Sequence, residues 1–135
     1  MTRPRGHRYA ALALAMLGLA CGDATTAPNV ATETLRVSLV GLGGNDAGAV
    51  VQLIGPINQI ESAGAALDVA WVADGPSSVT VVLVGPLSES GDVLVVRRPG
   101  GLAPLRAEVR EVAAADGTVS STSSVRAIVR TTGTP

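Results

Sequence analysis

Short apolar segments that alternate with polar residues constrain this chain more than any other feature of its sequence. In the first such segment, Leu35, Val37 and Leu39 alternate with Arg36 and Ser38. A period of two places the three apolar side chains on one face of an extended strand. Glycine, proline, asparagine and aspartate separate this segment from similar ones further along the chain, and these residues favour turns. We therefore expect an all-β fold.

The alternation predicts about eight strands. They are expected at residues 34–39, 49–54, 57–63, 67–73, 79–84, 92–97, 105–115 and 125–130. The seventh segment is rich in alanine and is also compatible with a helix, but Pro104 and the Asp116-Gly117 pair bracket a hairpin-like unit and favour a strand. Short strands joined by tight turns are typical of an antiparallel β-sandwich. A small β-barrel is the alternative.

Two details of the core can be predicted from the same pattern. Trp71 is in phase with Leu67 and Val69, which predicts that it fills the core. Residues 79–84 are apolar on both faces apart from Thr80, which predicts a strand that is covered on both sides.

The pattern also constrains how the last two predicted strands are connected. A two-residue hairpin at Asp116-Gly117 would pair Ala107 with Arg126 and mix core and solvent faces, which a sheet does not tolerate. A bulge, a longer loop through residues 120–124, or a last strand that crosses to another sheet would resolve this conflict. We favour the longer loop.

The N-terminus reads as an export signal. Three arginines precede an apolar run that stops at Cys21, the only cysteine in the chain. The predicted organisation is a signal peptide at 1–20, a flexible tether at 21–32, one domain at 33–130 and a frayed tail at 131–135. An apolar run of this length is too short to span a bilayer core of about 30 Å.

Two families resemble parts of this sequence. The segment Leu17-Gly18-Leu19-Ala20-Cys21 resembles the lipobox of bacterial lipoproteins, which implies that Cys21 is lipidated and anchors the protein to the cell envelope, at the outer membrane in a Gram-negative cell. The pair Gly18 and Ala20 equally suits an ordinary signal peptidase, whose product would be secreted. Residues 45–56 and the valine-rich strands after them resemble the immunoglobulin-like or cohesin-like sandwiches of bacterial surface proteins. Cohesin-like domains imply protein binding and surface assembly, and the resemblance transfers no binding residue.

Removal of the signal peptide leaves a composition that excludes many kinds of site. Seven arginines, no lysine and eleven acidic residues remain, a net charge of −4, which argues against binding to nucleic acid. His7 and Tyr9 are removed with the signal. The mature chain therefore lacks the imidazole of a catalytic triad and the usual ligands of zinc, copper and haem, so we expect no catalytic residue and no cofactor.

Three pairs of residues are candidates for a site. Asn45 and Asp46 follow a glycine-rich loop and could supply oxygen ligands to calcium, although a turn without metal explains them equally and is the interpretation we favour. Arg97-Arg98 could receive an anionic partner, but solvated charges at a strand end are the simpler interpretation.

The third pair is Glu108 and Glu111, which could act as the paired carboxylates of a glycosidase. The mature chain has no aromatic shell to hold a sugar, so we expect Glu108 to lie on a polar strand face with Arg106 and Arg110 and to pair with neighbouring strands. The expected function is that of a non-enzymatic, membrane-anchored domain that binds or scaffolds a protein. The alternative is a small carrier of an apolar ligand.

Overall fold

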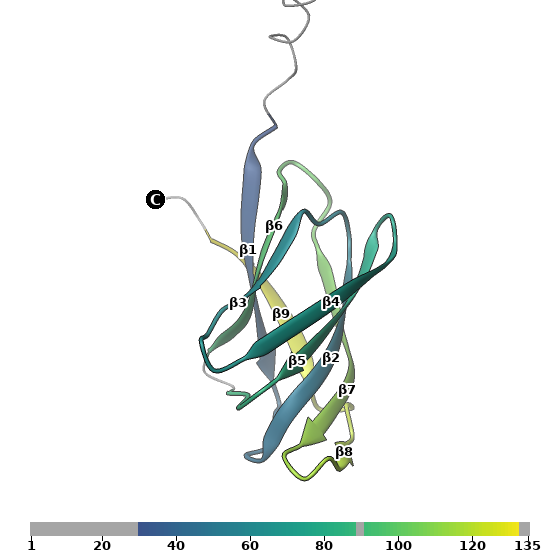
Figure 1. Cartoon of the computed structure of the whole chain (residues 1–135). Helices are drawn as coiled ribbons and strands as arrows, with labels where there is room; N and C mark the ends of the chain where they lie inside the picture. Colours follow the sequence, from purple (N-terminus) through teal and green to yellow (C-terminus); the bar gives the residue numbers. More distant parts are fainter. Residues whose placement is uncertain (1–29, 89–90, 133–135) are drawn as a thin grey trace, which may run out of the picture. The chain divides into compact units, whose positions relative to one another are not determined.

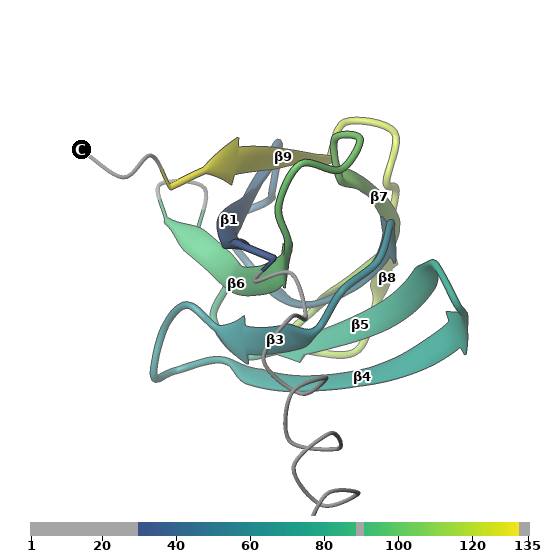
Figure 2. The same cartoon turned by 90° about the horizontal axis from the view of Figure 1, so that it is seen from above.

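A computed structural model of the chain describes residues 30–88 and 91–132. The predicted signal peptide, Cys21 and most of the predicted tether lie outside these residues, as do residues 133–135. From Ala31 onward the described chain forms one unit of two antiparallel sheets without a helix (Figure 1). The predicted all-β sandwich is confirmed, and the sheets of the described chain do not close into a barrel (Figure 2).

Nine strands, one more than predicted, make up the described part of the sandwich. The four-stranded sheet has the order β3-β6-β1-β9, with bounds Gln59–Ser62, Asp92–Pro99, Thr32–Val40 and Arg126–Thr131. The five-stranded sheet has the order β4-β5-β2-β7-β8, with bounds Asp68–Gly75, Ser78–Val84, Asp46–Ile54, Arg106–Ala114 and Val119–Ser120. The additional strand is β8, which has only two residues.

The core lies between the two sheets and follows from the period of two. In β1, Leu35, Val37 and Leu39 are buried while Arg36 between them is exposed. The largest fully buried side chains are Leu39, Leu53, Leu83, Leu94, Val37, Val51, Val81, Val93, Val96 and Val112. Full burial of an aliphatic side chain of this size contributes about 1.5–3 kcal/mol. The core is thus built from leucine and valine alone at its most buried positions.

The segment at 105–115 is a strand, β7, as the flanking turn residues predicted. The Asp116-Gly117 turn does form a hairpin, but only with β8, which pairs Val112 with Ser120. The chain then leaves the five-stranded sheet, and β9 pairs with β1 in the other sheet. The preferred longer loop within one sheet was therefore wrong, and the crossing to a second sheet is what resolves the register conflict.

Trp71 is not a core residue, which corrects the prediction. It shares the phase of Val69 and pairs with the buried Val81, so its side chain is on the inner face of β4. However, β4 is an edge strand, and its neighbour across the sandwich is the short edge strand β3. This partner does not cover Trp71, which is 50% exposed.

The C-terminal strand extends further than predicted. Thr131 belongs to β9, and the backbone N–H and the hydroxyl of Thr132 both donate to the carbonyl oxygen of Thr34, at 3.1 and 2.7 Å. The described residues of the predicted tail are therefore held in or beside the sheet.

Candidate interaction surface

The outer face of the five-stranded sheet is apolar over its central strands. Cross-strand pairing places Val84 beside Gly48 and Gly48 beside Ala113 in one row. The next row joins residues 70, 82, 50 and 111 across four strands. We call this surface the valine face and define it by Gly48, Val50, Ala70, Val72, Val82, Val84 and Ala113. Its apolar members are neighbours in the sheet, so the exposed surface is contiguous.

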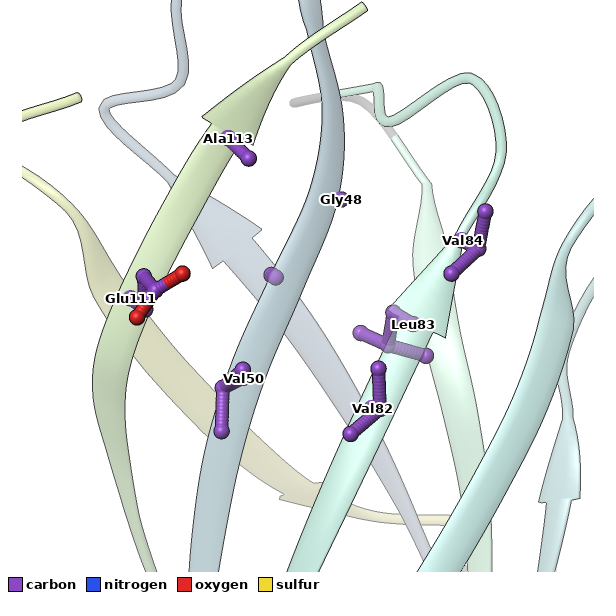
Figure 3. A pocket seen from close by; sticks show the side chains of 8 residues that line it. Gly48, Val50, Val82, Leu83, Val84, Glu111 and Ala113 are labelled. Carbon is purple, nitrogen blue, oxygen red and sulfur yellow. The ribbon is translucent and has the colours of Figure 1, made fainter. Parts of the chain in front are cut away.

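A shallow hollow occupies part of the valine face (Figure 3). Figure 3 shows Val50, Val82 and Val84 around Gly48, whose missing side chain leaves the backbone of β2 open. An open depression of about 550 Å³ adjoins the hollow, shares Gly48, Val84 and Ala113 with it, and is lined further by Ala47 and Pro86. It lies on the outside of the sandwich and not between the sheets.

The exposure of these valines corrects the prediction for residues 79–84. Val79, Val81 and Leu83 are buried, but Val82 is 40% and Val84 is 55% exposed. Strand β5 has a neighbour on each side within its sheet, yet in the described chain no second layer covers its outer face. A strand that is apolar on both faces is therefore half solvated here.

The outer face of the four-stranded sheet has a different character. Asp92 accepts ion pairs from Arg36 at 3.3 Å and from Arg130 at 2.9 Å, and Arg130 also donates to Ser38. This face is covered by paired charges, as expected for a surface in contact with water. The valine face has no such network at its centre.

A bulge in β7 brings one carboxylate to the border of the valine face. Val51 pairs with Val109 and Val50 pairs with Glu111, so Arg110 is the extra residue. The bulge shifts the alternation, and Glu111 lies on the same face as Val50 (Figure 3). The sequence carried a signal for this shift, because Val109 and Val112 are both apolar yet three positions apart.

The two candidate glutamates are not paired in the structure. Glu108 forms ion pairs with Arg110 at 2.9 Å and with Arg106 at 3.6 Å, both on its own strand. Arg110 also donates to the side chain of Gln52 on β2, so the predicted pairing with a neighbouring strand holds for this residue. Glu111 has no ion pair among the described residues and lies apart from this network.

Asp46 is the first residue of β2, and its carboxylate is bound to the glycine-rich loop before it. The Asp46 carboxylate accepts a hydrogen bond from the backbone N–H of Gly43 at 2.6 Å and one from the Ser120 hydroxyl at 3.5 Å. The backbone carbonyl of Asn45 accepts a hydrogen bond from the N–H of Ala115. Both oxygens of the carboxylate therefore have partners within the protein. No group of three acidic, histidine or cysteine residues suited to a metal occurs in the described segments.

The two adjacent arginines have different environments. Arg97 is exposed and lies 3.9 Å from Glu61. Arg98 is only 2% exposed, and its guanidinium forms an ion pair with Glu33 at 2.9 Å and donates to the carbonyl of Ala103 at 2.9 Å. Arg97 is a solvated charge at a strand end, as expected. Arg98 is a buried cation that links the loop after β6 to β1.

Comparisons with known proteins found no matching family model, no matching curated protein and no matching solved structure. Between residues 30 and 132, with 89–90 excepted, no helix is long and apolar enough to cross a membrane.

Proposed function

We propose that this chain is a non-enzymatic lipoprotein of the cell envelope whose sandwich domain binds another protein through the valine face. The observation that carries the proposal is the contiguous apolar surface at the centre of the outer face of the five-stranded sheet. Single exposed apolar residues are ordinary, but a contiguous group of them marks an interaction site. Paired charges cover the outer face of the other sheet, which makes the valine face the favoured surface for a partner.

The hollow lies far from the residue at which the chain enters the sandwich. The chain enters the sandwich at Thr32, and β1 runs from there to the opposite end of the unit (Figure 1). Strand β2 starts at this opposite end, so Gly48 and the hollow lie far from Thr32. The hollow therefore lies at the end of the sandwich opposite to the one at which the chain enters, and a tether attached there would leave it uncovered.

The geometry gives less support to the alternative, a carrier of an apolar ligand. A carrier needs an enclosed volume of about 300 Å³ or more. The depression beside Gly48 is large enough, but it is open to solvent and lies outside the sandwich. Leucine and valine side chains occupy the space between the sheets. A broad, open apolar surface is better suited to a protein than to a small molecule.

The test is capture of partners by the full mature protein from envelope extract after chemical cross-linking. Val82→Glu places a charge at the centre of the valine face and should abolish capture. Ile128→Glu is the matched control, because Ile128 is 42% exposed on the outer face of the other sheet, against 40% for Val82. Both variants should keep the wild-type circular dichroism spectrum.

The proposal would fail if Val82→Glu captured the same proteins as the wild type. It would also fail if the wild type captured no protein at all. Loss of capture in both variants would place the contact elsewhere on the domain and would also contradict the valine face.

A further inference from the structure

We infer that β4 is an open sheet edge that receives an extended, basic strand from a protein partner. The inference rests on the proposed protein-binding function and names the partner's chemistry and its mode of attachment. An edge strand leaves a row of backbone N–H and C=O groups without partners, and such a row can pair with a strand from another chain.

The other edges of the described sheets are protected by the usual means. Strand β3 has four residues and β8 has two, too short to offer a long ladder. Strand β9 carries Arg126 and Arg130, and charged side chains oppose edge pairing. The part of β7 beyond β8 carries alternating charges, and β9 packs against β7.

Strand β4 has none of these protections between Asp68 and Asp74, the two charged residues near its ends. It spans eight residues without a cation or a proline, and only Val69 among them is partly buried. A bulge is confined to its Gly75 end, so Asp68 to Ala73 pairs regularly with β5. Trp71 and Val72 are exposed on its two faces, which leaves large apolar side chains beside an open edge.

The uncovered half of Trp71 gives the edge a specific contact. A strand added to β4 would place its inward side chains over Val69, Trp71 and Ala73, where β3 does not reach. Tryptophan is enriched among the residues that dominate binding energy at interfaces. Apolar side chains at alternate positions of the partner would therefore bury the indole ring.

Charge identifies the rest of the partner. Asp68 has no ion pair within the described chain, and Asp74 accepts a hydrogen bond from Thr80 but has no cation partner. These two carboxylates lie near the two ends of β4. Opposite charges on directly facing strands are stabilising, and like charges are destabilising. The fitting partner has a lysine or arginine near each end of an alternating apolar strand.

A second copy of this chain fits the edge less well. Antiparallel pairing of β4 with itself about Trp71 would set Asp68 against Asp74 of the second copy. It would also invert the second copy, so that the two Thr32 ends lie on opposite sides of the pair. Ten residues separate Cys21 from Thr32, and a random coil of ten residues spans about 17 Å. A nine-residue strand is about 30 Å long, so both copies could not readily be anchored in one membrane.

The probes are three labelled peptides with capped ends. The first, Lys-Val-Thr-Val-Thr-Val-Lys, presents valines toward Trp71 and lysines toward the two aspartates. The second has glutamate in place of both lysines, and the third has proline in place of the central valine. Trp71 is the only tryptophan of the chain, so its emission reports on the edge directly. With the full mature protein, the lysine peptide should shift this emission to the blue and bind about tenfold more tightly than the glutamate peptide.

A charge exchange decides the matter. The double variant Asp68→Lys with Asp74→Lys should reverse the preference and favour the glutamate peptide, as measured by fluorescence anisotropy. Glu111→Lys is the matched control, because Glu111 is an exposed acid on β7 that has no cation partner among the described residues. This variant should keep the wild-type preference. Circular dichroism verifies that each variant is folded.

Equal affinity for the three peptides, or a preference that the charge exchange leaves unchanged, would overturn the inference. The appearance of a dimer of the wild type in sedimentation, with a concentration-dependent blue shift of Trp71, would also overturn it and assign the edge to a second copy. Neither result bears on capture through Val82, so the valine face can survive the failure of the edge. Conversely, if Val82→Glu left capture unchanged, the peptide affinities would still test the edge at β4 independently.

Discussion

Trp71 illustrates how the same residue type takes a different role at an edge. Its side chain is 50% exposed although it lies on the inner face of β4. Trp71→Ala should therefore lower the free energy of unfolding by about 1 kcal/mol. Truncation of a fully buried aromatic side chain would lower it by about 3–5 kcal/mol. Urea denaturation measures this difference.

Fluorescence provides a second measurement on the wild type. A half-exposed indole should emit at long wavelength and be quenched readily by acrylamide. A blue emission that resists quenching in the dilute protein would contradict the position of Trp71 at an open edge.

Arg98 should be the most sensitive charged residue of the sandwich. Its guanidinium is buried between Glu33 and the carbonyl of Ala103, so Arg98→Ala removes both interactions and the packing of the side chain. We expect a loss of about 3 kcal/mol in the free energy of unfolding, as measured in urea. Arg97→Ala is the control at the adjacent position, where an exposed pair contributes at most about 1 kcal/mol. Equal losses for the two variants would show that Arg98 is not a structural cation.

At the scale of elements, a glycine in β2 has room for a side chain, whereas a glycine in the loop before β2 has none. A Cβ on Gly48 would meet Leu83 O at 3.5 Å and the Ala113 Cβ at 3.9 Å, which are ordinary contacts. Gly48→Ala should therefore raise the free energy of unfolding by about 0.5–1 kcal/mol, because alanine loses less backbone entropy on folding.

Gly41→Ala is the matched contrast for this prediction. Gly41 has a φ of 83°, and a Cβ there would lie 2.0 Å from the carbonyl oxygen of Ser124. This variant should be clearly destabilised in the same thermal or urea titration. A stabilised Gly41→Ala, or a destabilised Gly48→Ala, would contradict the backbone described for this end of the sheet.

The turn between β7 and β8 should respond to acid. Hydrogen bonds from the Thr118 side chain, and then from its backbone N–H, hold the pKa of Asp116 below its ordinary value of 3.8. The folded state thus binds fewer protons than the unfolded state in this range. The contribution of Asp116 to stability is present above pH 3.8 and is lost as the pH falls through the lower, folded pKa.

The measurement for Asp116 is an NMR titration of its carboxyl group. Asp116→Asn should remove the corresponding part of the acid dependence of unfolding and lower stability slightly at neutral pH, where the charged carboxylate makes its contribution. A carboxyl group that titrates at or above 3.8 in the folded protein would contradict the hydrogen bonds of this turn.

At the scale of the whole molecule, the central prediction is the membrane anchor. Cells fed a clickable fatty acid should label the wild type and not Cys21→Ser, because the thiol of Cys21 is the expected site of attachment. Fractionation should then find Cys21→Ser in the soluble fraction. Label of equal intensity in both proteins would contradict the lipoprotein proposal, and an unlabelled, secreted wild type would favour ordinary signal cleavage.

Local pattern was sufficient to predict the fold class and most of the strands. The alternation of Leu35, Val37 and Leu39 depends only on the pleat of a strand, which repeats every two residues whatever the neighbours are. The same holds for the turn at Asp116-Gly117, whose residues favour a tight turn by themselves. The buried face of β1 and the strand at 105–115 could therefore be assigned from the sequence.

Tertiary structure decided which of these faces water reaches. Trp71 has the phase of a core residue, but its exposure depends on its strand being at an edge and on the length of the strand opposite. Val82 and Val84 look like core residues by type, yet their outer face is left uncovered in the described chain. Arg98 looks solvated until the loop after β6 folds over it. The face of a strand on which a side chain lies depends only on its position in the local alternation. Whether that face is buried depends on the order of the strands in the sheet and on what packs against it, and these bring together residues that are distant in the chain.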